Sequence, residues 1–232
     1  MKKFELTDEF IIDDFGHKLF RIKALADFGT IRAGELGGFV EKEENLSSDG
    51  NAWVYGNARV YDNAWVYGNA CVYDNARVYG NARVYGNALV YDNARVYGNA
   101  RVYGNAQVYD NALVYGNAQV YDNALVYGNA RVYDNARVYG NAQVYGNACV
   151  SGNADYAVVE GFGRYFRATT FFRCKDKILR VRCGCFYGDL AKFREIVKKT
   201  HGDSKYAKEY LAIADLMELH FSDEEGRQEA TE

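Results

Sequence analysis

The central part of the chain repeats one pattern of apolar and polar positions every six residues. From Trp53 to Ala154 it divides without insertion into seventeen hexapeptides, most of them x-Val-Tyr-Gly-Asn-Ala or x-Val-Tyr-Asp-Asn-Ala. Repeats this regular are typical of solenoid architectures. Because alternate residues of a strand face opposite sides, Ala and Val point inward together, whereas x and Tyr point outward. Each hexapeptide therefore predicts one short strand followed by one corner.

The corner is predicted from the Gly-Asn or Asp-Asn pair in each unit. Glycine, aspartate and asparagine tolerate the positive φ that a tight turn between strands requires. Ladders of stacked Asn side chains and continuous backbone hydrogen bonds between coils are then the expected stabilising interactions.

The repeat resembles the hexapeptide-repeat superfamily, in which an aliphatic residue is followed four positions later by a small one. Val54 and Ala58 fit this motif, as do their equivalents through Val150 and Ala154. The resemblance implies a mainly β fold, namely a left-handed parallel β-helix with three hexapeptides per coil. Its five to six coils would form a rod about 27 Å long. The chain is also similar to uncharacterised bacterial and phage proteins of this kind that are often labelled as transferases.

A period of eighteen residues assigns the outward positions to three chemically unequal faces. Two faces carry several arginines at x, whereas the third has only Trp, Cys, Leu and Gln there, beside a column of tyrosines. We call this third surface the Leu–Tyr face and take its candidate binding residues to be Tyr55, Tyr73, Leu89, Tyr91, Tyr109, Leu125 and Tyr127.

The Leu–Tyr face has two interpretations. Large apolar surfaces usually mark interfaces, which favours a symmetric homo-oligomer, a dimer or a trimer, or another protein partner. Alternatively, the tyrosines only cover the strand backbone and stack along the rod, with Arg side chains over their rings.

Residues 1–52 are predicted to form an N-terminal cap with one degenerate coil. The segment Leu19–Leu25 predicts a strand, and Gly37-Gly38 and Asp49-Gly50 predict turns. Three apolar residues stay in phase with the inward Ala column: Val40, Leu46 and Ala52. A terminal coil must present a different surface to solvent, which the acidic residues of the cap would provide.

After the repeat, residues 155–221 predict a small α+β module, and the acidic tail 222–232 is expected to be disordered. Strands at Arg164–Cys174 and Ile178–Cys185 would form a β-hairpin with one apolar and one basic face. Two helices would cover the apolar face. Their predicted bounds are Leu190–Lys199, capped by Asp189, and Ser204–Phe221, with an apolar stripe of Tyr206, Tyr210, Ala214, Met217 and Phe221.

The basic side of the hairpin is the second candidate binding site. Its residues are Arg167, Arg173, Lys175, Lys177, Arg180 and Arg182. Such a cluster can bind phosphate groups while an aromatic ring stacks on a base, which would make nucleic acid a partner. An acidic protein partner and a merely solvated, edge-protecting face are the alternatives.

No metal site, cofactor or catalytic residue is predicted. Cys174, Cys183, Cys185 and His201 are potential zinc ligands, but their spacing matches no zinc motif, and the thiols share the inward phase of the hairpin. We favour buried thiols.

The resemblance raises acyltransferase activity as an alternative. Enzymes of the superfamily use a His base and a loop inserted between coils. His17, His201 and His220 lie outside the repeat, and the repeat has no insertion. The sequence therefore favours a non-catalytic binding or scaffold protein. If the similarity to phage proteins holds, its partner is a protein of the bacterial host.

Composition adds mainly exclusions. The chain has 232 residues, a formal net charge of −3, five Cys and no Pro. No apolar run reaches the about 18 residues of a membrane-spanning helix, so no membrane partner is expected. Because the Cys number is odd and no secretion signal follows Met1, we predict reduced thiols and a cytoplasmic location in a bacterial cell, whether or not a phage encodes the chain.

Overall fold

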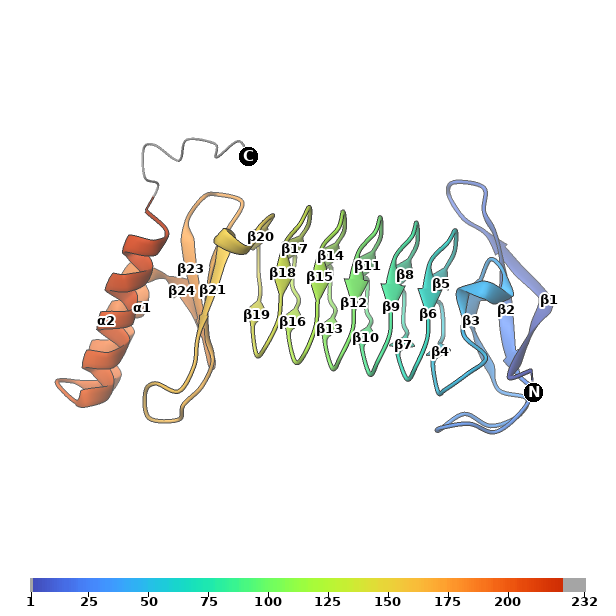
Figure 1. Ribbon diagram of the computed structural model, residues 1–232, viewed down its shortest axis with the longest axis horizontal. Helices are drawn as coiled ribbons and strands as arrows, with labels where there is room; N and C mark the ends of the chain where they lie inside the picture. The colour runs from blue at the N-terminus through green and yellow to red at the C-terminus, as the bar shows by residue number, and fades with distance from the viewer. Residues whose placement is uncertain (1, 223–232) are drawn as a thin grey trace, which may run out of the picture. The chain divides into compact units, whose positions relative to one another are not determined.

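The computed structural model describes residues 2–222. The chain divides into two compact units, residues 1–153 and residues 154–232. The first unit contains the cap and the solenoid, and the second contains the α+β module (Figure 1).

The solenoid consists of seventeen two-residue strands arranged in three parallel ladders, in which each strand pairs with the strand eighteen residues further on. The first ladder carries the Leu–Tyr face and contains β4 (Trp53–Val54), β7 (Cys71–Val72), β10 (Leu89–Val90), β13 (Gln107–Val108), β16 (Leu125–Val126) and β19 (Gln143–Val144). The second contains β5 (Arg59–Val60), β8 (Arg77–Val78), β11 (Arg95–Val96), β14 (Leu113–Val114), β17 (Arg131–Val132) and β20 (Cys149–Val150). The third contains β6 (Trp65–Val66), β9 (Arg83–Val84), β12 (Arg101–Val102), β15 (Gln119–Val120) and β18 (Arg137–Val138).

These ladders confirm the parallel β-helix with three hexapeptides per coil and the assignment of outward residues to three faces. Figure 1 shows the coils following one another along a single axis of this unit. The left-handed sense of the helix stays a prediction.

The interior of the solenoid is filled by the two inward columns that the pattern predicts. Val102 and Ala106 are fully buried, as is every other Val and nearly every Ala of the repeat. Side chains of this size leave little free volume between strands that face each other across a narrow coil, so the repeat admits only small inward residues.

The corners follow the predicted chemistry. Residues with positive φ in the repeat are Gly or Asp, for example Gly104 at 70° and Asp110 at 57°. The Asp110 carboxylate also accepts a hydrogen bond from the Gly128 amide of the next coil at 2.9 Å. Asn side chains bond to one another from coil to coil, as in Asn87 Nδ2 to Asn105 Oδ1 at 3.1 Å, which confirms the Asn ladder.

The N-terminal cap is a three-stranded extension of the second ladder. Strand β1 (Phe4–Ile12) pairs antiparallel with β2 (Lys18–Ala24), and β2 pairs antiparallel with β3 (Leu36–Val40). Strand β3 then pairs parallel with β5. The predicted strand at Leu19–Leu25 is confirmed as β2, whereas β1 was missed.

The degenerate coil exists, but its predicted phase is wrong by two residues. Val40 pairs with Val60 and Leu46 with Val66, a step of twenty residues, so both continue the Val column and not the Ala column. Trp53 pairs with Cys71 at the regular step of eighteen. The cap coil therefore contains two extra residues.

Gly37-Gly38 is also not a turn, because both residues lie within β3. A Cβ atom at Gly38 would approach the Ala58 carbonyl oxygen to 2.7 Å, so glycine permits close contact between strand and solenoid at this point. The turn predicted at Asp49-Gly50 is present, with a φ of 72° at Gly50.

The cap encloses Trp53, the first residue of the ladder that carries the Leu–Tyr face. Trp53 is fully buried against the rings of Phe4 and Phe28, at centroid distances of 6.3 and 5.3 Å. Beside them, the Lys3 ammonium donates to the Ala52 carbonyl at 2.8 Å, and burial lowers the Lys3 pKa to about 8. Tyr55 is half-buried like Tyr73, so the cap covers the Trp53 side chain and leaves the tyrosine column of the Leu–Tyr face accessible from its first member.

The second unit contains a four-stranded antiparallel sheet and two helices. The strands are β21 (Tyr156–Val159), β22 (Thr169–Arg173), β23 (Leu179–Cys183) and β24 (Phe186–Asp189), and the helices are α1 (Leu190–His201) and α2 (Lys205–His220). The predicted hairpin is the central pair β22–β23, but it is shorter than expected and the outer strands were missed. Asp189 caps α1 as predicted, accepting from the Lys192 amide at 2.7 Å.

Both helices contribute to one core against one face of this sheet. Phe171 pairs with Val181 and faces the helices, whereas Phe172 pairs with Arg180 on the opposite face. Because Phe171 and Phe172 are adjacent and both apolar, the alternation of residues along the strand does not decide which of them faces the helices. In α2, Tyr206 is exposed and Ala207 and Ile213 join the stripe instead. The predicted disordered tail lies outside the described residues except for Ser222.

Candidate binding surfaces

The tyrosines of the Leu–Tyr face form a regular stack along the rod. The ring centroids of Tyr73, Tyr91, Tyr109 and Tyr127 follow one another at 5.0, 4.8 and 4.8 Å, and successive planes differ by at most 11°. Tyr55 meets Tyr73 edge to face at 6.1 Å. The spacing equals that of adjacent strands, so the backbone ladder imposes the stack.

The two leucines of this face lie on strands β10 and β16 of the first ladder. Leu89 and Leu125 are each half-buried, and Tyr91 donates to the Gln107 side chain at 3.2 Å. Burial raises the pKa of Tyr73 to about 12 and also raises the pKa of Tyr55 and Tyr91, so these three phenols are neutral near pH 7. The stacking required by the second interpretation is confirmed, and use of the face as an interface stays a prediction.

The six basic residues of the hairpin do not share one face. Arg180 forms a bidentate pair with Asp176, at 2.7 and 2.6 Å, and this hydrogen-bonded guanidinium lowers the Asp176 pKa to about 2. Arg173 belongs to the helix-covered side, where its Nη2 donates to the Phe221 carbonyl at 2.9 Å. The single basic face predicted for the hairpin is therefore wrong.

The remaining members are equally dispersed. Lys175 and Lys177 lie in the β22–β23 turn, where Lys177 adopts a φ of 63°. Arg182 lies opposite Thr170, and its Nη1 donates to the Cys185 carbonyl at 3.5 Å. Arg167 precedes β22 and stacks on Tyr165, with 4.8 Å from its Cζ to the ring centroid.

The thiols and His201 are also separated. Cys174 is buried, and burial raises its pKa. Cys183 lies on β23 and accepts from the Thr169 hydroxyl at 3.1 Å, whereas Cys185 is exposed. The inward phase predicted for all three thiols holds only for Cys183, which packs against the helix-covered core, because Cys185 is exposed and Cys174 is buried on the opposite face beside Arg180. Within residues 2–222, no group of three or more His, Cys, Asp or Glu side chains is arranged to hold a metal ion.

The histidine nearest to the repeat is engaged through both ring nitrogens. His17 Nδ1 lies 3.0 Å from Asp13 Oδ2, and Nε2 lies 3.4 Å from Asp62 Oδ1. The hydrogen bond to Asp13 raises the His17 pKa, against the opposing effect of burial. Because both ring nitrogens lie against carboxylates of the protein itself, this geometry fits a structural role for His17 in the cap.

A pocket of about 210 Å³ in the α+β module was missed from the sequence. Buried and half-buried side chains of β24, α1 and α2 form its floor, and the remaining lining residues form its rim. The floor contains Phe186, Phe193, Ile196, Val197 and Tyr210, and the rim contains Arg164, Tyr165, Arg167, Cys183, Cys185, Thr200 and His201. Burial raises the Tyr210 pKa to about 12. Residues 161–167, Gly-Phe-Gly-Arg-Tyr-Phe-Arg, border it, and we call them the aromatic–basic loop.

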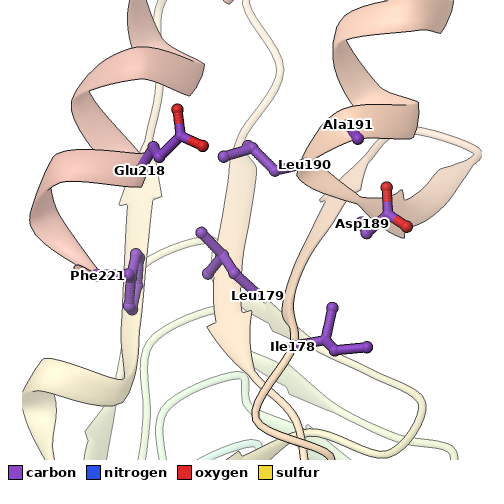
Figure 2. A pocket seen from close by; sticks show the side chains of 7 residues that line it. All are labelled: Ile178, Leu179, Asp189, Leu190, Ala191, Glu218 and Phe221. Atoms are coloured by element: carbon purple, nitrogen blue, oxygen red, sulfur yellow. The ribbon is translucent and has the colours of Figure 1, made fainter. Parts of the chain in front are cut away.

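A second hollow, of about 400 Å³, lies where α1 begins and α2 ends (Figure 2). Leu179, Leu190 and Phe221 line it together with the carboxylates of Asp189 and Glu218. Both carboxylates are already occupied, by the Lys192 amide and by Arg194 at 2.7 Å. This hollow therefore offers apolar surface without an uncommitted polar group, unlike the pocket beside the aromatic–basic loop.

Comparison with known families agrees with the ladder geometry. The model described as the YdcK Beta solenoid repeat matches the chain in nine segments between residues 52 and 154, several of them overlapping. Residues 52–154 form a β-solenoid repeat. The matched segments coincide with the hexapeptides and leave out both the cap and the α+β module, and the description names a repeat and no activity. No curated protein matches the chain.

No helix within residues 2–222 is long and apolar enough to cross a membrane.

Proposed function

We propose that this β-solenoid protein is a non-catalytic scaffold that binds protein, and that it self-associates through the Leu–Tyr face. The observation that carries the proposal is the uninterrupted stack of half-buried aromatic side chains on a ladder with no charged x position. Neutral phenols and leucines lose little on desolvation and bury large areas at low entropic cost, as interface cores require.

The other two faces are less suited to contact with a second copy. A two-fold interface places identical surfaces against each other, so the arginines at Arg59, Arg77 and Arg95 would meet like charges. The Leu–Tyr face avoids this repulsion, and the corner carboxylates of Asp74, Asp92 and Asp110 at its edge provide a polar rim.

The solenoid geometry supports a scaffold more than the acyltransferase alternative. Every coil between Trp53 and Ala154 has the same length, so no inserted loop forms a wall against which an acyl carrier could lie. The histidines lie outside the repeat, and His17 is held by two carboxylates. The similarity to phage proteins leads us to propose a host protein as the partner.

The test uses one substitution at two positions of the same type. Leu125→Arg places a charge on the Leu–Tyr face, and Leu113→Arg places the same charge on the second ladder, where Leu113 is also half-buried. By light scattering at about 100 µM, we expect the unsubstituted chain to have a multiple of its 26.2 kDa mass. Leu125→Arg should weaken self-association at least tenfold, and Leu113→Arg should leave it unchanged.

A monomeric unsubstituted chain, or equal effects of the two substitutions, would contradict self-association through this face. Acetyl-coenzyme A binding by calorimetry would instead favour the acyltransferase alternative.

A further inference from the structure

The pocket beside the aromatic–basic loop combines an apolar floor with two guanidinium groups that have no acidic partner. Arg164 and Arg167 make no ion pair with a carboxylate of residues 2–222, and the Cζ atoms of the two guanidinium groups lie 5.5 and 4.8 Å from the centroid of the Tyr165 ring. Glu209, whose carboxylate contacts the loop, already accepts from the Gly163 amide at 2.9 Å and pairs with Lys205. The guanidinium groups of Arg164 and Arg167 can therefore pair with carboxylates of a ligand at the rim of the pocket.

We propose that this pocket binds a segment of a partner protein, in which one bulky apolar side chain fills the floor and flanking carboxylates pair with Arg164 and Arg167. The inference deepens the proposed function, on which it rests only in taking the partner to be a protein. It does not depend on self-association of the solenoid.

The size of the pocket favours a side chain over a cofactor or metabolite. Small-molecule sites usually enclose roughly 300–1,000 Å³. The volume here is about 210 Å³, which accommodates one Phe, Leu or Trp side chain and not a nucleotide-bearing group such as coenzyme A. A single anchor in a small pocket is the usual arrangement at the centre of a protein interface.

The floor is part of the module core and is therefore preformed. Phe193 and Val197 are buried, and Phe193 meets Phe186 at 5.5 Å and Tyr210 edge to face at 5.8 Å. Because these residues also hold α1 and α2 against the sheet, the pocket does not have to be ordered when a ligand binds.

The loop beside the pocket displays aromatic side chains that the fold does not use. Tyr165 and Phe166 are 62% and 71% exposed, and Phe166 has a φ of 52°. A non-glycine residue in this left-handed backbone conformation costs about 1–2 kcal/mol of folding free energy, so the surrounding structure must hold Phe166 in it. Exposed Tyr, Phe and Arg beside a pocket are typical of residues that dominate binding energy.

Nucleic acid fits these features less well. Sequence-tolerant binding of single strands uses a basic groove that follows the backbone across several nucleotides, with successive stacking rings. The pocket is instead small and apolar with the cations at its rim, and Arg180 of the hairpin is already paired with Asp176.

The experiment measures the fluorescence polarisation of labelled five-residue peptides mixed with the 232-residue chain. The probes are Glu-Glu-X-Glu-Glu with X as Phe, Leu, Trp or Ala, and a Lys-Lys-Phe-Lys-Lys control. We expect at least one of the Phe, Leu and Trp peptides to bind below about 1 mM, and the Ala and Lys peptides to bind at least tenfold more weakly.

Two variants act on different parts of the site. Arg164→Ala with Arg167→Ala should weaken binding at least tenfold and flatten its salt dependence. Thr200→Trp, at an exposed lining position, should abolish binding by filling the pocket. Lys175→Ala with Lys177→Ala removes the same charge from the β22–β23 turn and should leave binding unchanged. Circular dichroism of α1 and α2 checks that each variant is folded.

The proposal is overturned if no peptide binds at about 1 mM, if the Arg and Thr200 variants bind as the unsubstituted chain does, or if an oligothymidylate is bound in place of the acidic peptides. The Leu125→Arg variant separates the two proposals, because it should lose self-association and keep peptide binding.

Discussion

The solenoid and the α+β module place the same kinds of residues under opposite constraints. In the solenoid, positive φ values within the repeat occur only at Gly and Asp, which adopt them at little cost. In the module they also occur at Phe166 and Lys177. The corner carboxylates and amides of the solenoid bond to the next coil, whereas Arg164 and Arg167 face solvent beside a pocket.

The difference follows from repetition itself. A side chain that recurs every eighteen residues lies directly against its own copy, so its hydrogen-bonding and stacking capacity is used within the rod. Side chains that are free to bind a partner therefore remain at the outward x positions and in the segments outside the repeat. This is why we place self-association on a flat face of the solenoid and selective recognition in the irregular module.

The largest effect is expected from a charge in the solenoid interior. Val102 is fully buried, and the adjacent Arg101 is exposed on the same two-residue strand. Val102→Asp should cost at least about 4 kcal/mol, because an unpaired carboxylate has no partner among the Val and Ala columns. Denaturant unfolding measures the free energy.

Arg101→Asp is the matched control and should change stability by less than about 0.5 kcal/mol. If Val102→Asp unfolded at nearly the same denaturant concentration as its control, the view of the solenoid as a tightly packed stack would be wrong.

An intermediate effect is expected from alkaline pH. Burial raises the pKa of Tyr61 and Tyr73 to about 12, above the ordinary value of about 10. Because the folded state holds these phenolic protons more tightly than the unfolded chain, their contribution is complete below about pH 10 and is lost as pH rises toward 12. Stability of the solenoid should therefore fall in this window.

Phenolate absorbance measured alongside denaturant midpoints would follow both processes. Phenols that titrate near pH 10 without loss of folded structure would show that the Tyr stack is more open to solvent than its burial indicates.

The smallest effect on stability is expected from glycine substitutions at two residues with positive φ, one of them strained and one relaxed. Phe166→Gly should stabilise the module by about 0.5–1 kcal/mol, because glycine adopts this φ without penalty. Asp110→Gly, at a solenoid corner with a φ of 57°, should not stabilise, since it loses the hydrogen bond to the Gly128 amide. If the Phe166 ring contacts the partner, the stabilised variant should also bind the acidic peptides more weakly.

A stabilising effect at Asp110 equal to that at Phe166 would remove the contrast between the two regions. Thermal unfolding of both variants measures the sign.

The strict period made the three faces predictable, because one register decides the position of every residue from Trp53 to Ala154. Where the pattern is degraded, prediction failed. Two extra residues in the cap coil moved Val40 and Leu46 to another column, and the adjacent Phe171 and Phe172 left the strand phase undetermined.

The pocket was missed for a related reason. The basic and apolar residues of 164–167 imitate strand alternation, but the positive φ values of Gly161, Gly163 and Phe166 turn this segment into a loop. Glycines on either side of an exposed aromatic were the available signal. The contacts of Arg164 and Arg167 depend on tertiary structure and have no local signature.

Strand β3 shows how a stack of nearly identical coils is prevented from adding further chains. An unpaired edge of the second ladder would accept a coil from another molecule as readily as its own. By pairing β3 with β5 on one side and with β2 in the antiparallel sense on the other, the cap replaces that edge with a hairpin of different sequence and geometry. At this end of the second ladder, the length of the rod is therefore set by the number of hexapeptides that the sequence contains, and not by the concentration of protein available to add to it.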